Sequence, residues 1–302
     1  MREARISLVG VALMLVVATY AFAIDPAYVS VRGRDSWPCN RAKPCRTFAR
    51  ALTVTDLGGT VVALDSGVFS DSHLIVSQAV TIEAVPGARA ELRESGFALS
   101  VNATLSDVVV LRNLTFTGDG STFNNGIVLN AAEALHVENC VVSGFGVKGI
   151  LSLSVGELYV LDSVFRNNFI GISLDGPTTA SMDSVRLEDG HFGLFASFGA
   201  QVTVKNSVAS GHSFAGFSAS EGAGGVDTVV NIEDSMAANN DIGIEARGSG
   251  NDIGIVRVSH SVVTGNHIGL QVGQGVIETR GNNTVAGNLT NVNGVLTLIP
   301  GT

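Results

Sequence analysis

Lysine and proline are scarce in this 302-residue chain, and their scarcity narrows its function. The sequence has 18 lysines and arginines against 27 aspartates and glutamates, and only Lys43, Lys148 and Lys205 are lysines. Basic runs are absent, so we expect no nucleic-acid partner and no anionic membrane partner. Six prolines beside 36 glycines fit many tight turns rather than disorder. The repeats described below carry no helical apolar stripe, which excludes leucine-rich and ankyrin-type repeats.

The longest apolar run lies at the N-terminus. Residues 6–23 are almost wholly apolar, follow Arg2 and Arg5, and end in Ala21-Phe-Ala23. This pattern predicts a secretory signal peptide over residues 1–23 with cleavage before Ile24. An uncleaved membrane anchor is the alternative, because the run is close to the length of a membrane span. Cleavage would leave a secreted, periplasmic or cell-surface protein without membrane contact.

The predicted cleavage also sets the net charge of the exported chain. Residues 1–23 contain two arginines and one glutamate, so their removal leaves 18 − 2 = 16 basic and 27 − 1 = 26 acidic residues, a net charge of −10. Such a balance favours solubility and disfavours binding to anionic surfaces.

A polar position, usually Asn or Asp, recurs eight times at intervals of 26, 23, 21, 23, 28, 26 and 22 residues. Its members are Asn113, Asn139, Asp162, Asp183, Asn206, Asp234, His260 and Asn282. Five residues after the member comes Gly or Asn in seven of eight cases, and these residues tolerate a left-handed backbone at a turn. A period of this length predicts a solenoid in which each repeat covers its neighbour.

The repeat unit consists of short strands. Runs such as Leu158-Tyr-Val-Leu and Ile255-Val-Arg-Val alternate apolar and polar residues, which is typical of half-buried strands. Roughly 22 residues accommodate three short strands and their turns. Residues 46–302 are therefore predicted to form one all-β domain, a right-handed parallel β-helix of roughly ten coils. Successive coils would lie ~4.8 Å apart. The protein is expected to be a monomer. The recurring Asn/Asp position would form a side-chain ladder at one turn.

From these motifs the chain resembles the pectin-lyase-like right-handed parallel β-helix proteins over residues 46–298. Arg46-Thr-Phe-Ala-Arg-Ala-Leu matches the short cap helix that opens such domains, with Thr47 or a neighbour as its N-cap. The resemblance is specific for the fold and weak for activity, because this architecture serves lyases, hydrolases, epimerases, adhesins and inert modules.

Two cysteines precede the predicted cap, within the N-terminal segment 24–45. In an exported protein Cys39 and Cys45 would form a small disulfide loop. A two-cysteine metal site is the alternative, although no other Cys or His lies nearby to complete it. Cys140 occupies the position that serine takes in other repeats, which predicts a buried free thiol.

The resemblance places a candidate site on the outer face of one strand column. The best match is the strand that opens with Gly followed by Ile, Leu or Phe, whose outward residues include Asp175, Phe195, Glu245, Arg247 and Gln271. We expect Asp175, Phe195 and Gln271 to contribute to substrate binding. Asp175 and Glu245 are three coils apart, about 14 Å. Glycosidase carboxylate pairs lie about 5 to 10 Å apart, so this pair does not fit.

The turn before these strands supplies the sharpest catalytic hypothesis. Asp241 and His267 occupy the same turn position in adjacent coils, near Glu245, Arg247 and Gln271. A carboxylate could orient the imidazole for proton abstraction. Arg247 could neutralise the carboxylate of a uronate. The alternative is a solvated turn with a favourable Asp–His contact.

No cofactor is predicted, and calcium is the metal ion that the carboxylates of the ladder could bind. Asp162 and Asp183 would stack as neighbours, but ladder carboxylates usually bond their own turn amides. Arg186 falls where neighbouring coils are apolar, which leaves the register of its coil open.

We therefore expect the protein to act through its outer surface. A polysaccharide-binding or partner-binding role without strong catalysis comes first. The alternatives are a lyase, epimerase or hydrolase acting on acidic glycans, and a structural or adhesive rod.

Overall fold

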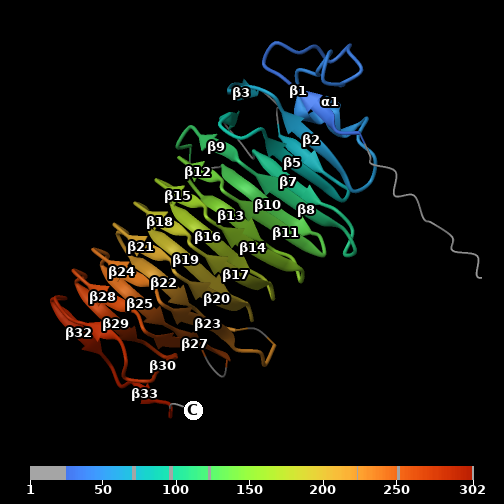
Figure 1. Ribbon diagram of the computed structural model, residues 1–302. Helices are drawn as coiled ribbons and strands as arrows, with labels where there is room; N and C mark the ends of the chain where they lie inside the picture. The colour runs from blue at the N-terminus through green and yellow to red at the C-terminus, as the bar shows by residue number, and fades with distance from the viewer. Residues whose placement is uncertain are drawn as a thin grey trace, which may run out of the picture.

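The computed structural model describes residues 25–69, 73–94, 98–121, 124–222, 224–249 and 252–300. The predicted signal peptide lies outside these ranges. Within them the chain forms three long sheets that run the length of an elongated stack, and every coil contributes one strand to each sheet (Figure 1). This is the all-β parallel solenoid that the repeat predicts.

The first sheet contains β1 (Ala27–Val29), β2 (Gly59–Ala63), β5 (Val80–Ala84), β8 (Val108–Arg112), β11 (Ala134–Glu138), β14 (Glu157–Leu161), β17 (Thr179–Asp183), β20 (Gln201–Lys205), β23 (Thr228–Glu233), β27 (Asp252–Ser259), β30 (Val276–Thr279) and β33 (Thr297–Leu298). They pair in this order and in parallel, and β26 (Gly248–Ser249) adds an antiparallel contact to β27.

The second sheet contains β4 (Leu74–Val76), β7 (Leu99–Asn102), β10 (Asn125–Ala131), β13 (Lys148–Ser152), β16 (Ile170–Asp175), β19 (Phe192–Ser197), β22 (Ala215–Ala219), β25 (Ile242–Ala246), β29 (Ile268–Val272) and β32 (Thr290–Asn293). It carries the predicted site.

The third sheet contains β3 (Gly67–Phe69), β6 (Ala90–Glu94), β9 (Leu114–Gly118), β12 (Val141–Ser143), β15 (Val164–Arg166), β18 (Arg186–Glu188), β21 (Val208–Ser210), β24 (Met236–Ala238), β28 (Val262–Thr264) and β31 (Thr284–Val285). Stacked apolar side chains from all three sheets form one continuous core.

The cap helix is confirmed at the start of the solenoid. α1 (Phe48–Leu52) begins after Thr47, whose side chain accepts a hydrogen bond from the Arg50 amide. Asp35 accepts further bonds from the amides of Arg46 and Thr47. Phe48 is fully buried against Phe69, with ring centroids 5.0 Å apart, so the helix closes the first coil.

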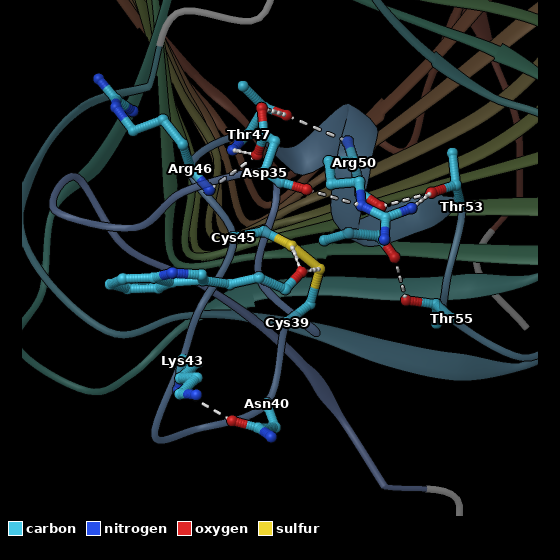
Figure 2. Close-up of a disulfide and its surroundings, with 12 residues drawn as sticks. Asp35, Cys39, Asn40, Lys43, Cys45, Arg46, Thr47, Arg50, Thr53 and Thr55 are labelled. Atoms are coloured by element: carbon cyan, nitrogen blue, oxygen red, sulfur yellow. Dashed lines mark hydrogen bonds between the residues drawn. A yellow bond between two sulfur atoms is a disulfide. The ribbon is translucent and has the colours of Figure 1, made fainter.

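Cys39 and Cys45 form a disulfide beside this helix, with Cα atoms 4.6 Å apart (Figure 2). The Tyr28 amide donates to the Cys39 carbonyl at 2.6 Å, and the Cys45 amide donates to the Tyr28 carbonyl at 2.8 Å. Tyr28 lies in β1, the first strand of the first sheet. The disulfide loop therefore covers a sheet edge that would otherwise be open.

The interior of the second sheet follows the predicted alternation. The residue after each strand-opening glycine is almost completely buried, as seen for Ile127, Ile150, Ile172, Leu194, Phe217, Ile244 and Leu270. Hydrophobic contacts between equivalent positions in adjacent coils thus hold the stack together.

The outer Asn/Asp ladder is present, with a correction in two coils. Asn139 donates to Asn113 at 2.7 Å, and both have a left-handed backbone. In the coil of Asn282, Gly281 takes the left-handed position, although the Asn282 side chain still lies 3.2 Å from His260. In the coil of Asp183, however, Ser184 takes the left-handed position, because Asp183 is the last residue of β17 and pairs with Leu161 and Lys205. The predicted ladder was therefore wrong by one residue in this coil. The same shift places Asp189, rather than Glu188, at the second turn.

A second polar ladder, not predicted, lies inside the stack. The backbone amide of Asn240 donates to Oδ1 of Asn266 at 2.9 Å, and the backbone amide of Asn266 donates to Oδ1 of Asn288 at 2.9 Å. His212 occupies the equivalent position one coil earlier, and its amide donates to Asn240. These side chains satisfy backbone groups at a buried corner.

A column of charged side chains runs along the outside of the first sheet. Arg112 of β8 lies between Glu83 of β5 and Glu138 of β11, at 3.1 and 2.7 Å. Hydrogen bonding to Glu138 raises the pKa of Arg112. The column alternates in sign over these three adjacent coils.

No helix in the described ranges is long and apolar enough to cross a membrane.

Candidate functional site on the outer face of the second sheet

The middle of the outer face of the second sheet is apolar. Ile170, Phe192, Ala215, Ile242 and Ile268 lie at paired positions on five successive strands. Phe192, Ala215 and Ile242 are buried, yet they form a cluster separate from the main core. The strands therefore have apolar side chains on both faces, which is unusual for a face open to water.

Aromatic rings lie along the turn beside this cluster. Phe169 stacks on His191 at 4.8 Å between centroids, and the His191 ring lies 5.3 Å from Phe214. Phe192 contacts Phe195 and Phe214 at 5.1 and 4.9 Å. We call Phe169, His191, Phe192, Phe195 and Phe214 the aromatic patch. Its rings extend over three coils, and Phe169 is 50% exposed.

Arg247 places a positive charge at one end of the aromatic patch. The Arg247 guanidinium lies over the Phe214 ring at 4.7 Å. Its Nε atom lies 2.8 Å from Oε1 of Glu245, a buried residue that also accepts a hydrogen bond from Ser218 at 3.1 Å. Glu245 thus holds Arg247 against the ring. This cation–π contact joins a planar cation to the aromatic patch.

A second carboxylate lies close to Arg247. Ser220 donates a hydrogen bond to Glu221, and this bond lowers the pKa of Glu221, with Arg247 adding a smaller effect in the same direction. Glu221 therefore stays ionised at neutral pH. The surface around Arg247 combines one cation with two carboxylates.

Asp241 and His267 are brought together, as the spacing predicts. His267 Nδ1 lies 3.0 Å from Asp241 Oδ1, and both side chains are about half exposed. The Ile268 amide donates to the Asp241 carbonyl at 2.8 Å, so the two turns are in register. The carboxylate can orient the imidazole by accepting its N–H. Their catalytic role stays a prediction.

Asp175 is held by a residue that the sequence analysis did not select. Lys148 Nζ lies 2.5 Å from Asp175 Oδ2, and Ser173 donates to Asp175 Oδ1 at 2.6 Å. Lys148 occupies the same position on β13 as Ile170 on β16. A lysine at a position that is apolar in the five following coils was the available signal.

The other predicted site residues lie on this face but differ in exposure. Phe195 is half-buried and belongs to the aromatic patch. Gln271 is half-buried and accepts a hydrogen bond from Asn293 at 2.9 Å. Glu245 points outward but is buried by neighbouring side chains. The face is therefore more covered than alternation alone implies.

A metal site needs several carboxylate, imidazole or thiolate groups that meet at one point. The described residues contain no cluster of three or more His, Cys, Asp or Glu side chains that could hold a metal ion. Asp162 is level with Ser184 and not with Asp183 in the paired strands. The prediction that the two aspartates are neighbours in the ladder was therefore wrong.

Comparison with known proteins agrees with this architecture. A family model described as a right-handed beta helix region matches residues 125–290, more than half of the chain. No curated protein sequence matches the chain.

Two solved structures are similar to it. The pectate lyase Pel9A aligns with a TM-score of 0.66 and 15% identity over 90% of this chain and 78% of its own. An alginate lyase from Paenibacillus sp. str. FPU-7 aligns with a TM-score of 0.57 and 13% identity over 91% of this chain and 98% of its own. At these identities the likeness concerns the fold.

Proposed function

We propose that this chain, which belongs to the right-handed β-helix family, is an exported protein that binds polysaccharide along the outer face of its second sheet without strong catalysis. The observation that carries the proposal is the aromatic patch ending at Arg247. Exposed apolar surface on a protein this acidic calls for a function.

The patch suits an extended ligand. Phe169, His191 and Phe214 follow one another coil by coil, so they offer successive contacts at the ~4.8 Å spacing of the strands. Aromatic side chains supply large apolar contact areas at little cost in conformational entropy. A run of such contacts on a long surface fits a polymer better than a small molecule, which is usually bound in a concave pocket.

Arg247 would add selectivity. Glu245 engages its Nε atom, and the guanidinium carries further N–H donors at its two Nη atoms. These donors match a carboxylate or sulfate of an acidic glycan. Glu245 and Glu221 would disfavour a glycan of high charge density, because like charges repel at close range.

Glycan-array binding tests the proposal. The whole sequence is expressed so that the host processes any leader, and the purified protein is applied to neutral and acidic glycans with and without chelator. Phe169→Ala should weaken binding to any glycan that the wild type binds by about fivefold, since an aromatic contact contributes roughly 1 kcal/mol.

A matched control is available on the next coil. Phe198 is 49% exposed, like Phe169, but lies outside the aromatic patch. Phe198→Ala should leave binding unchanged. If no glycan binds, or if both variants lose binding equally, the proposal fails and a structural rod becomes the better description.

The Asp241–His267 pair favours a second candidate, a lyase acting on acidic glycans. His267 would take a proton from the carbon beside a uronate carboxylate, Asp241 would orient the imidazole, and Arg247 would neutralise the carboxylate. The electron pair would form a C=C bond as the glycosidic C–O bond on the next carbon breaks, and the departing oxygen would take a proton from water. Incubation with uronate polymers, followed by ultraviolet absorbance of unsaturated products, tests it. Turnover that disappears in His267→Gln while glycan binding persists would support this candidate.

A further inference from the structure

The two ends of the solenoid are built differently. At the N-terminal end, α1 and the disulfide loop lie over the first coil (Figure 1). Phe48 and Phe69 are fully buried there. At the other end, the last strands of the three sheets are β31, β32 and β33. Every residue of β32 and β33 is exposed.

The core itself opens at this end. Val292 of β32 pairs with Leu270 of β29, which pairs in turn with Ile244 of β25. Leu270 and Ile244 are each 1% exposed, whereas Val292 is 37% exposed. Val292 continues the inward-facing column, and no further coil in the described ranges lies over it. Water therefore contacts a position that is core in every neighbouring coil.

Other apolar side chains of the last coil are more exposed still. Leu289, Val295 and Leu298 are 79%, 85% and 75% exposed. Together with Val292 they define what we call the C-terminal face. Exposed apolar groups gathered on one coil are typical of an interaction surface.

Charge distinguishes the C-terminal face from the rest of the molecule. No Asp, Glu, Lys or Arg follows Arg280 in the sequence, although the chain has a net charge of −9. Two copies repel each other on average, and repulsion is weakest where both surfaces are neutral. Strand edges exposed to solvent are normally protected by charged residues. The strands of the C-terminal face have none.

We propose that two copies of this chain associate tail to tail through their C-terminal faces. The open edges of β31, β32 and β33 need facing strand edges, and a second C-terminal face supplies three of them. The N-terminal end of another copy does not, because α1 and the disulfide loop cover it. A two-fold contact of this kind is closed, so it produces a dimer rather than a filament. This inference replaces the monomer expected from the sequence.

Solution mass and shape test the proposal. The complete sequence is expressed, the monomer mass is taken from mass spectrometry, and light scattering after size exclusion gives the mass in solution. The expected result is twice the monomer mass. Small-angle X-ray scattering should show a maximum dimension about twice that of one solenoid, because the contact is end to end.

Matched valine variants locate the contact. Val295→Lys places a charge in the C-terminal face and should return the protein to monomer mass, with at least a tenfold weaker association. Val155 is 64% exposed in the turn before β14, so Val155→Lys is the control and should stay dimeric. Circular dichroism verifies that both variants keep their strand content.

Four results overturn the proposal. A wild-type protein that is monomeric at all concentrations excludes the contact. A dimer that survives Val295→Lys, or one that is no longer than the monomer, places the interface elsewhere. Masses that increase continuously with concentration indicate open-ended assembly or another partner surface.

Discussion

The guanidinium of Arg247 lies over the ring of Phe214, with Cζ 4.7 Å from the ring centroid. The two residues belong to adjacent coils, since Phe214 precedes β22 and Arg247 follows β25. A planar cation on an aromatic face keeps its charge at the surface while its carbon and nitrogen plane covers apolar area. This contact joins the apolar and charged parts of the proposed site.

Replacing Arg247 by Lys tests whether the planar cation matters. Lys keeps the charge but loses the flat stacking surface, so glycan binding should weaken about fivefold, corresponding to roughly 1 kcal/mol. Titration calorimetry with a glycan that binds the wild type provides the measurement.

Arg257 gives the matched control. Its Nε atom lies 2.6 Å from Glu278 on the first sheet, and its side-chain exposure of 44% is close to the 39% of Arg247. Arg257→Lys should leave binding unchanged. Equal losses in both variants would contradict a local role for Arg247.

His212 should make the protein sensitive to acid. Its Nε2 atom lies 3.1 Å from the Leu187 carbonyl, where ladder asparagines elsewhere place an amide N–H. Burial lowers the pKa of His212, and nearby His191 adds a small effect in the same direction, whereas the hydrogen bond to the Leu187 carbonyl and the charge of Asp189 oppose it. Because the folded-state pKa lies below the ordinary value of about 6.5, stability is full above that value and falls as pH decreases through the folded-state pKa.

His212→Asn should flatten this dependence, because asparagine is the ladder's usual residue. The melting temperature from neutral pH to about pH 5 is the measurement. His260 is exposed and occupies the outer ladder, so His260→Asn is the control and should keep the wild-type slope. An unchanged slope in His212→Asn would mean that other groups control acid stability.

Cys140 should tolerate replacement by serine at neutral pH. Ser163, Ser207, Ser235 and Ser261 occupy the same inner position, and Ser163 already donates to the neighbouring carbonyls. We expect Cys140→Ser to change the free energy of unfolding by less than about 1 kcal/mol. Denaturant titration tests this expectation.

Alkaline pH should distinguish the stability of the wild type from that of Cys140→Ser. Burial raises the pKa of Cys140 to about 12 from 9.0. The thiol is favoured in the folded state, so its stabilising contribution is complete below the unfolded-state value and is lost as pH rises toward the folded-state value. Cys140→Ser should lack this part of the alkaline loss, and native Cys140 should resist alkylation. Rapid alkylation without unfolding would contradict the buried position.

The Cys39–Cys45 disulfide should stabilise the first coil in particular. Its removal by a Cys39→Ser, Cys45→Ser double substitution should cost about 2 kcal/mol, because the loop is short. Hydrogen exchange should accelerate at the Tyr28 and Cys45 amides, whose bonds hold the loop on β1. The Ile150 amide, several coils away, is the internal control. Equal acceleration there would indicate global rather than local loss.

Much of the fold could be predicted because each coil repeats the same physical solution. The glycine preceding Ile127 and its equivalents identified the inward column, and the regular interval brought Asp241 beside His267. These features depend on period and strand alternation, which a sequence displays directly.

The errors have local causes. Asp183 was placed in the outer ladder because it is acidic and correctly spaced, but β17 extends through it and Ser184 forms the turn. Glu245 was correctly directed outward, yet it is buried beside Ser218 and Arg247. Alternation gives the direction of a side chain, whereas its exposure depends on the size of its neighbours in adjacent coils. The sequence interval does not supply that information.

The charged column on the first sheet bears on how the coils find their order. Most coils place similar aliphatic residues inside, so burial alone distinguishes poorly between correct stacking and stacking that omits a coil. Omitting the coil of β8 would bring Glu138 against Glu83, two like charges without the intervening Arg112. The column thus penalises one specific misassembly, and it does so at the surface, where the core has no influence.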